Sequence, residues 1–318
     1  MPRNPKKNLE ELHKEFIVYC RSVSKLAETT IRGYEASFGV FMSLVPGASV
    51  DNLSMEVLTY FFNKLDTRER ISGVNNIKKG IRKSTQRTYW SKLTVFFDWL
   101  VHTNKIQQNP LKYMRPPQVR YEDKRFLGKE ELLKIFTAIS TTIEWSNLFV
   151  KKRNIALFTV AFTCGLRKGE LLGLRCIDVD LDRAQLTVRA ETSKSKSNRV
   201  VPLNHNTIQC LRDYIAERNR RNYQTPELFA SDNKDTRLTE HGLKHLVFYI
   251  VKQSGIKFHM HRFRHSFAIN LISNGSDVSK VQQLMGHRDI RMTSAYLRCR
   301  PTDSMRADVD RISIDSMP

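Results

Sequence analysis

Two stretches in the first third of the chain place apolar residues at helical spacing. Apolar side chains recur there every three or four positions, which is typical of a helix that packs one face against a core. They are Ile31, Tyr34, Phe38 and Phe41 in residues 28–42, and Tyr89, Leu93, Phe96, Phe97 and Leu100 in residues 84–101. We expect Ser84 to cap the second helix. Because alternating patterns are scarce here, the sequence predicts an all-helical first domain.

The helical pattern ends at Asn109-Pro110, and a proline-containing stretch follows. Arg115–Arg120 includes two consecutive prolines, which fix their own backbone and restrict the residue before them. We therefore predict a first domain over residues 1–115, a linker over residues 116–126 and a second domain over residues 127–318.

The spacing of apolar residues changes in the middle of the second domain. Two short segments, residues 185–190 and 198–203, are rich in β-forming residues. The polar run ETSKSKS separates them, so we expect a hairpin or small sheet with a basic loop. Helices are predicted on both sides, at about 129–142, 151–164, 206–221, 238–253, 262–273 and 277–286, with a short one around Tyr296. The predicted fold class is mainly α: a helical N-terminal domain followed by an α+β domain with a small sheet.

The chain carries a large excess of positive charge. Its 53 Lys and Arg against 32 Asp and Glu give a net charge of +21, spread almost evenly over the two predicted domains. Such an excess favours a polyanionic partner, although a basic surface that only aids solubility is the alternative. One basic cluster surrounds the start of the second helix, where it is either a DNA-facing surface or a solvated face. It contains Lys78, Lys79, Arg82, Lys83, Arg87 and Lys92.

The five cysteines are widely spaced and form no CxxC pair, which indicates reduced thiols and neither a disulfide framework nor a zinc ribbon. No run of about 18 apolar residues is present. We expect a cytoplasmic protein that is not associated with a membrane.

Four motifs in the second domain carry candidate chemistry. They are TCGLRKGELLGL at 163–174, the basic hairpin, HRFRH at 261–265, and LMGHRDIRMTSAYLR at 284–298. Each is weak alone, because an Arg-x-x-Glu is often a surface ion pair and a helical tyrosine usually packs in a core. His261 and His265 are spaced to share a metal ion. Arg262, however, stands where zinc proteases have a glutamate, and its charge would oppose a divalent cation and favour an anion.

Taken together, in order and spacing, the four motifs resemble the catalytic pattern of tyrosine recombinases, which include phage integrases and Xer-type proteins. The resemblance covers about residues 126–300, and TIRGYEASFGVF and STQRTYWSKLTVFFDWL in the first half resemble the family's N-terminal core-binding domain. It implies a site-specific DNA recombinase that cleaves and rejoins strands through a covalent 3′-phosphotyrosine. A catalytically idle DNA-binding regulator and a type IB topoisomerase-like enzyme are the alternatives.

The resemblance also implies roles for single residues. Arg167 and Arg264 match the arginines that grip the scissile phosphate, Glu170 matches an acidic neighbour that supports the first of them, and Tyr296 matches the nucleophile. The remaining expected catalytic residues are Lys194, His261 and His287. We choose Lys194 over Lys196 because it precedes Arg199 by five residues, although the hairpin lacks the family's flanking glycines. The expected DNA contacts are Lys79, Arg82, Lys83, Arg87 and Arg199.

Phosphoryl chemistry explains why these residue types are needed. Two guanidinium groups can neutralise the oxygens of a phosphodiester with paired, charge-assisted hydrogen bonds. Free tyrosine has a pKa of about 10, so its hydroxyl needs nearby positive charge or a base, for which His261 and the arginine pair are the candidates. We expect His287 to hold a phosphate oxygen and Lys194 to protonate the leaving 5′ oxygen.

This mechanism requires no cofactor and no metal. The expected partners are a double-stranded recombination site and further copies of this chain, as a tetramer on DNA. The resemblance implies that the tail at 299–318, with Ile312 and Ile314, docks on a neighbouring protomer; a disordered terminus is the alternative.

Overall fold

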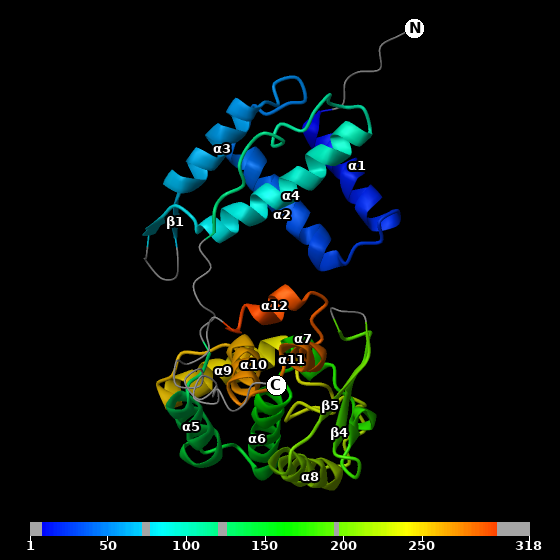
Figure 1. Ribbon diagram of the computed structural model, residues 1–318, viewed down its shortest axis with the longest axis vertical. Helices are drawn as coiled ribbons and strands as arrows, with labels where there is room; N and C mark the ends of the chain where they lie inside the picture. The colour runs from blue at the N-terminus through cyan, green and yellow to red at the C-terminus, as the bar shows by residue number, and fades with distance from the viewer. Residues whose placement is uncertain (1–7, 72–76, 120–125, 194–196, 298–318) are drawn as a thin grey trace, which may run out of the picture. The chain divides into compact units, whose positions relative to one another are not determined.

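The computed structural model describes residues 8–71, 77–119, 126–193 and 197–297, and Figure 1 shows its helices and strands. The chain divides into two compact units, residues 1–121 and residues 122–318. Each unit has hydrophobic core residues of its own. The predicted domain boundaries at residues 115 and 127 stay a prediction.

Four helices form most of the first unit, and α2 and α4 confirm the two helices predicted there. The helices are α1 (Leu9–Ser22), α2 (Glu28–Leu44), α3 (Met55–Thr67) and α4 (Lys83–His102). The Ser84 cap was wrong, because α4 begins one residue earlier, behind Arg82 as N-cap. The expectation of helices alone was also wrong, since β1 (Glu69–Ile71) and β2 (Ile77–Lys79) form an antiparallel ribbon. Strands of three residues are too short to show an alternating pattern.

The core of the first unit is a cluster of aromatic rings. Phe96 of α4 is 1% exposed and packs edge-on against Phe38, with ring centroids 5.4 Å apart. His13 of α1 is stacked on Phe38 at 3.9 Å between ring centroids. Burial among these rings lowers the pKa of His13 to about 4. The imidazole is therefore neutral near pH 7 and packs as an aromatic ring.

The second unit is mainly helical with a small sheet, as expected. Its helices include α5 (Lys129–Thr137), continued by the π-helical turn η1 (Ala138–Thr142), then α6 (Leu148–Thr163), α7 (Lys168–Leu172) and the 3₁₀ turn η2 (Cys176–Asp178). The others are α8 (His205–Arg220), α9 (Glu240–Ser254), α10 (Met260–Ser273), α11 (Val278–Met285) and α12 (Ile290–Ser294). The sheet has the order β3-β4-β5, with β3 (Val179–Asp180), β4 (Gln185–Val188) and β5 (Arg199–Pro202).

The predicted hairpin is confirmed by β4 and β5, which pair antiparallel with Leu186 opposite Val201. Both of these side chains are buried, whereas Gln185 and Pro202, the pair at one end of the ladder, are exposed. Period-two patterning therefore turns one face of the hairpin toward the core. The short α7, η2 and β3 were not predicted.

Helix α6 is the central element of the second unit. It is apolar around most of its circumference and packs against both α8 and α10 (Figure 1). Asn147 caps its start by accepting a hydrogen bond from the backbone N–H of Val150 at 3.0 Å. Its end leads directly into the turn that carries Arg167. None of the helices in the ranges given above is long and apolar enough to cross a membrane.

Candidate active site

A glycine turn after α6 sets the position of Arg167. Gly165 adopts φ +59°, and a Cβ there would overlap the ring of Phe267, so both backbone and space require glycine. Arg167 is the N-cap of α7, and its backbone N–H donates to Glu170 Oε2 at 2.9 Å. The sequence motif GLRKGE therefore builds a turn that fixes the backbone of Arg167 and brings Glu170 back to it.

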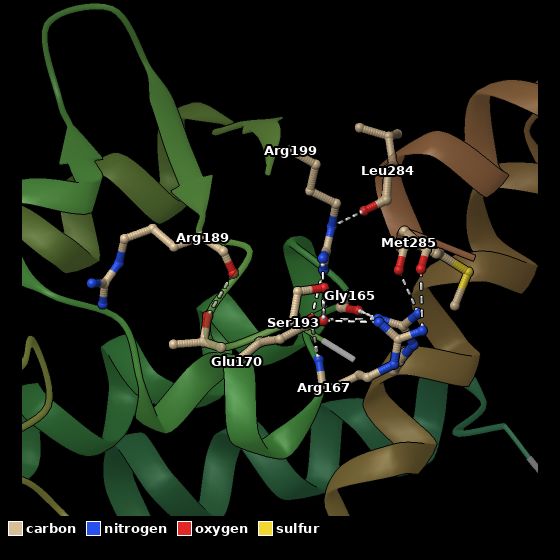
Figure 2. A network of polar contacts seen from close by, with 11 residues as sticks. Gly165, Arg167, Glu170, Arg189, Ser193, Arg199, Leu284 and Met285 are labelled. Carbon is tan, nitrogen blue, oxygen red and sulfur yellow. Dashed lines mark hydrogen bonds and ion pairs between the residues drawn. The ribbon is translucent and has the colours of Figure 1, made fainter. Parts of the chain in front are cut away.

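The Glu170 carboxylate is the centre of a buried charged cluster, shown in Figure 2. It is 1% exposed and faces three guanidinium groups. Arg167 Nη1 donates to Oε1 at 2.8 Å, and Arg199 Nη2 donates to Oε2 at 2.6 Å. Arg264 Nη1 lies 3.8 Å from Oε2. The sequence predicted support for one arginine, whereas the structure places three around this carboxylate.

The pKa of Glu170 reflects these partners. Burial alone would raise it, but the hydrogen bond and charge of Arg199, with the hydrogen bonds from Arg167, lower the pKa to about 2. Glu170 is therefore ionised at neutral pH. It supplies the negative charge that permits guanidinium groups to be buried together.

Helix α11 contributes its C-terminal carbonyl groups to the same cluster. Arg199 Nε donates to Leu284 O at 2.8 Å, Arg264 Nη2 to Met285 O at 2.6 Å, and Arg167 Nη2 to Gly286 O at 3.2 Å. These are the groups that a helix end leaves without intrahelical partners, and the helix dipole favours cations there. Three successive carbonyls thus hold three arginines that come from distant parts of the chain.

Arg264 is the most deeply buried of the three guanidinium groups. It is 3% exposed, and its Nη1 also donates to Gly165 O at 2.7 Å. Burial and the positive charge of Arg167 lower the pKa of Arg264 to about 9. The side chain remains a cation at neutral pH, in a position fixed from two sides.

Tyr296 and His287 lie beside one another after α11. The phenol ring is 2% exposed and is stacked parallel to the His287 ring, with centroids 6.4 Å apart. His287 Nδ1 makes a 2.8 Å hydrogen bond with Thr293 Oγ1. The Tyr296 hydroxyl makes a 2.7 Å hydrogen bond with His265 Nδ1. His265 was considered in the sequence only as a metal ligand, and its place next to Tyr296 was missed.

His261 lies on the same helix as Arg264 and is more exposed. Partial burial and the positive charges of Arg264, His259, Arg167 and Lys168 lower its pKa. It borders a cavity of about 430 Å³ that Lys168 and Lys244 also line. Its ring centroid lies 6.4 Å from that of His265. Within the described ranges, no group of three or more His, Cys, Asp or Glu side chains is arranged to hold a metal ion.

Two further expectations concern the β4–β5 hairpin: the catalytic Lys194 and the DNA contact Arg199. Lys194 lies outside the described residues, as does Lys196; the neighbouring Ser193 hydroxyl is 3.4 Å from Glu170 Oε1. Arg199 was expected to contact DNA. The structure shows instead that its guanidinium group is turned inward, with all three nitrogens bonded to Glu170 or Leu284 and a side chain only 8% exposed.

The four other expected DNA contacts belong to the first unit and are exposed. Lys79 lies on β2, and Arg82 is the N-cap of α4. Lys83 forms an ion pair with Asp66 at 2.9 Å, and Arg87 lies over the ring of Trp90 at 5.4 Å from its centroid. All four are therefore exposed basic residues on β2 or in the first turns of α4, and we refer to them as the basic surface of the first unit.

The chain is similar to known recombinases over most of its length. It is 28% identical to a tyrosine recombinase of Thermosipho africanus (91% of this chain, 95% of the relative) and 24% identical to the tyrosine recombinase XerC of Listeria innocua (90% and 92%).

Solved structures show the same fold. The Tn1549 transposon integrase in complex with transposon right end DNA has a TM-score of 0.76 at 19% identity, covering 96% of this chain and 99% of that one. The XerH recombinase bound to a palindromic difH substrate has a TM-score of 0.71 at 23% identity, covering 93% and 82%. The family model described as "Phage integrase family" matches residues 125–302, more than half of the sequence. The chain therefore belongs to the phage integrase family.

Proposed function

We propose that this chain is a site-specific DNA recombinase that cleaves and rejoins DNA through a covalent bond between a 3′ phosphate and Tyr296. One observation carries the proposal: Arg167, Arg264, His287 and Tyr296 come from separate segments and gather at the turn after α6 and the end of α11. A buried phenol beside fixed cations suits attack on a phosphodiester.

Arg167 and Arg264 would bind the scissile phosphate. A guanidinium group has five N–H donors, so it can satisfy protein acceptors and still present donors to a phosphate oxygen. Glu170 and the α11 carbonyls hold both groups before DNA arrives, so little reorganisation is needed in the transition state. We assign Arg199 to this supporting structure rather than to DNA contact.

The other expected catalytic residues complete the proposal. His287, oriented by Thr293, would donate a hydrogen bond to a phosphate oxygen. His261 has a lowered pKa and is largely neutral near pH 7, so it would bind the phosphate as a hydrogen-bonding group rather than as a cation. Lys194 would protonate the 5′ oxygen as it leaves. No metal or nucleotide enters these steps.

Double-stranded DNA is the proposed partner. Two structural neighbours are recombinases in complex with DNA. The exposed side chains of Lys79, Arg82, Lys83 and Arg87 support a DNA-contacting role for the first unit, with phosphate contacts giving salt-dependent affinity. We further propose that the protein assembles as a tetramer on the recombination site. We also propose that it is cytoplasmic, which is supported by four free thiols among the described residues. The tail at 299–318 lies outside the described residues.

Covalent capture tests this function. DNA that stays attached to the protein after denaturation would be recovered from expressing cells and sequenced to give the site. A nicked suicide duplex carrying that site should then yield a protein-DNA adduct on a denaturing gel, and Tyr296→Phe should abolish it. If the wild-type chain forms no adduct, or the Phe variant still forms one, the proposal fails. Product topology separates strand exchange from relaxation of a single duplex.

A further inference from the structure

Tyr296 forms a hydrogen bond with His265, a contact that the sequence motifs do not indicate. His265 Nδ1 lies 2.7 Å from the phenol oxygen, and the two ring centroids are 5.5 Å apart. His265 directly follows Arg264 on α10, so the helix that holds the buried arginine also brings an imidazole to the nucleophile. A distance of 2.7 Å is typical of a good hydrogen bond.

A general base must lie within hydrogen-bond distance of the proton that it removes. His265 meets this condition for the phenol proton. His261, the base expected from the sequence, lies one helical turn earlier on α10, with its ring centroid 6.4 Å from that of His265. The geometry therefore favours His265 over His261 as the base for Tyr296.

On the basis of the proposed function, we propose that His265 is the proton acceptor for Tyr296. The tautomer protonated on Nε2 accepts the phenol hydrogen bond at Nδ1. As Oη attacks, an Oη–P bond forms, the P–O5′ bond breaks, and the phenol proton passes to His265. The 5′ oxygen takes a proton from the general acid. In rejoining, a 5′ hydroxyl attacks phosphorus and gives its proton to the conjugate base of the general acid, while the Oη–P bond breaks and His265 returns its proton to the departing Tyr296 oxygen.

The role of His265 as a base predicts how the rate of cleavage depends on pH. Its ring faces those of His261 on the same helix and Tyr296 after α12, and Arg264, which interacts electrostatically with Tyr296, directly precedes it in the chain. The arginine cations favour a phenolate over a phenol. His265 accepts a proton only when it is neutral, so acid should stop cleavage.

The test compares four full-length variants in single-turnover cleavage of the nicked suicide duplex across pH. Asparagine places Oδ1 near the position of histidine Nδ1, so His265→Asn keeps a hydrogen-bond acceptor but cannot take the proton. His265→Phe removes both functions, His261→Asn is the matched control on the same helix, and Lys194→Ala removes the expected general acid. Gel-shift binding of the intact site and thermal unfolding verify that each variant folds.

We expect His265→Asn to bind DNA normally, to cleave about 100- to 10,000-fold more slowly, and to lose the acid limb of the pH profile. His261→Asn should keep that limb. A 5′-bridging phosphorothiolate has a leaving group that needs no protonation, so it should rescue Lys194→Ala but not His265→Asn. The proposal is overturned if His265→Asn cleaves at the wild-type rate or faster, keeps the acid limb, or is rescued by the phosphorothiolate.

A second measurement, made on the His265 side chain of the wild-type protein, tests the proposal even if the His265 variants do not fold. Nitrogen-15 NMR of the His265 imidazole should show an unprotonated Nδ1 that accepts a hydrogen bond, and Tyr296→Phe should shift that resonance. An unchanged resonance contradicts the proposal. Failure here is distinct from failure of the proposed function, because wild-type adduct formation and its loss in Tyr296→Phe do not depend on which histidine accepts the proton.

Discussion

The two units bury very different kinds of side chain. The first unit is held by aromatic rings such as Phe38 and Phe96, which gain free energy when they leave water. The second unit also has an apolar core, but beside it lies the Glu170 cluster, in which a carboxylate and three guanidinium groups lose their hydration. The comparison shows that the first core gains free energy by burial, whereas the charged cluster loses hydration and relies on its internal ion pairs to offset that loss.

The largest expected effect follows from removing the central charge. Glu170→Gln keeps the shape of the side chain but leaves three guanidinium groups without their carboxylate. We expect a loss of about 3–5 kcal/mol of stability in the second unit, as for other broken buried ion pairs. Cleavage of the suicide duplex should fall as well. Denaturant unfolding and single-turnover cleavage measure the two effects.

Glu240→Gln is the control for that change. Glu240 forms a 2.6 Å ion pair with Lys168, but both side chains are exposed, so the pair contributes little. A comparable loss of stability in both variants would show that burial of Glu170 is not what matters.

Phe96→Ala should lower stability by a similar or slightly smaller amount, but in the other unit. The ring is 1% exposed, and large-to-small changes of this kind cost about 3–5 kcal/mol. Hydrogen exchange read by mass spectrometry should show the loss of protection in α1, α2 and α4. The exposed neighbour Val95→Ala should change little. Loss of protection confined to the second unit would contradict this account of the first core.

Acid should weaken the second unit more than the first over a defined range. The pKa of Glu170 is lowered from its usual value near 4.5 to about 2, so its contribution to stability is fully present above 4.5 and is lost as pH falls toward 2. We expect the unfolding midpoint of the second unit to decline over this range. In Glu170→Gln that part of the decline should be absent; an unchanged pH dependence would rule out Glu170 as its source.

The smallest effect on stability is expected at the basic surface of the first unit. The Lys83–Asp66 pair is about half exposed, so Lys83→Met should cost less than about 1 kcal/mol. If Lys83 contacts a phosphate, the slope of log affinity against log salt should fall by about 1. Lys105→Met, an exposed change beyond the other end of α4, should leave the slope unchanged. Equal slopes in both variants would remove Lys83 from the DNA surface.

Local patterns predicted the parts of the fold that depend on local packing. The stripe from Tyr89 to Leu100 predicted α4, and the β-rich segments around Leu186 and Val201 predicted the hairpin. Each gives a clear periodic signal because one face is buried. The β1–β2 ribbon was missed because its strands are short and are defined mainly by backbone hydrogen bonds.

The sequence motifs named residues that the structure brings close together, but they did not predict the contacts that hold those residues. The motifs named Arg167, Arg264 and Tyr296, but the inward turn of Arg199 depends on a segment 85 residues further along the chain. The α11 carbonyls are backbone groups, which no side-chain motif records. The link between His265 and Tyr296 spans 31 residues and appears only when α10 and the segment after α12 are packed together.

The end of α11 ties the ability to cut DNA to the completion of folding. Arg167 is synthesised early in the second unit, yet its Nη2 is held by Gly286 O, 119 residues later. A partly unfolded chain carries the arginines and the tyrosine but has no assembled pocket for a phosphate. The phosphate pocket that the proposed cleavage requires is therefore complete only when the last helices of the second unit have folded.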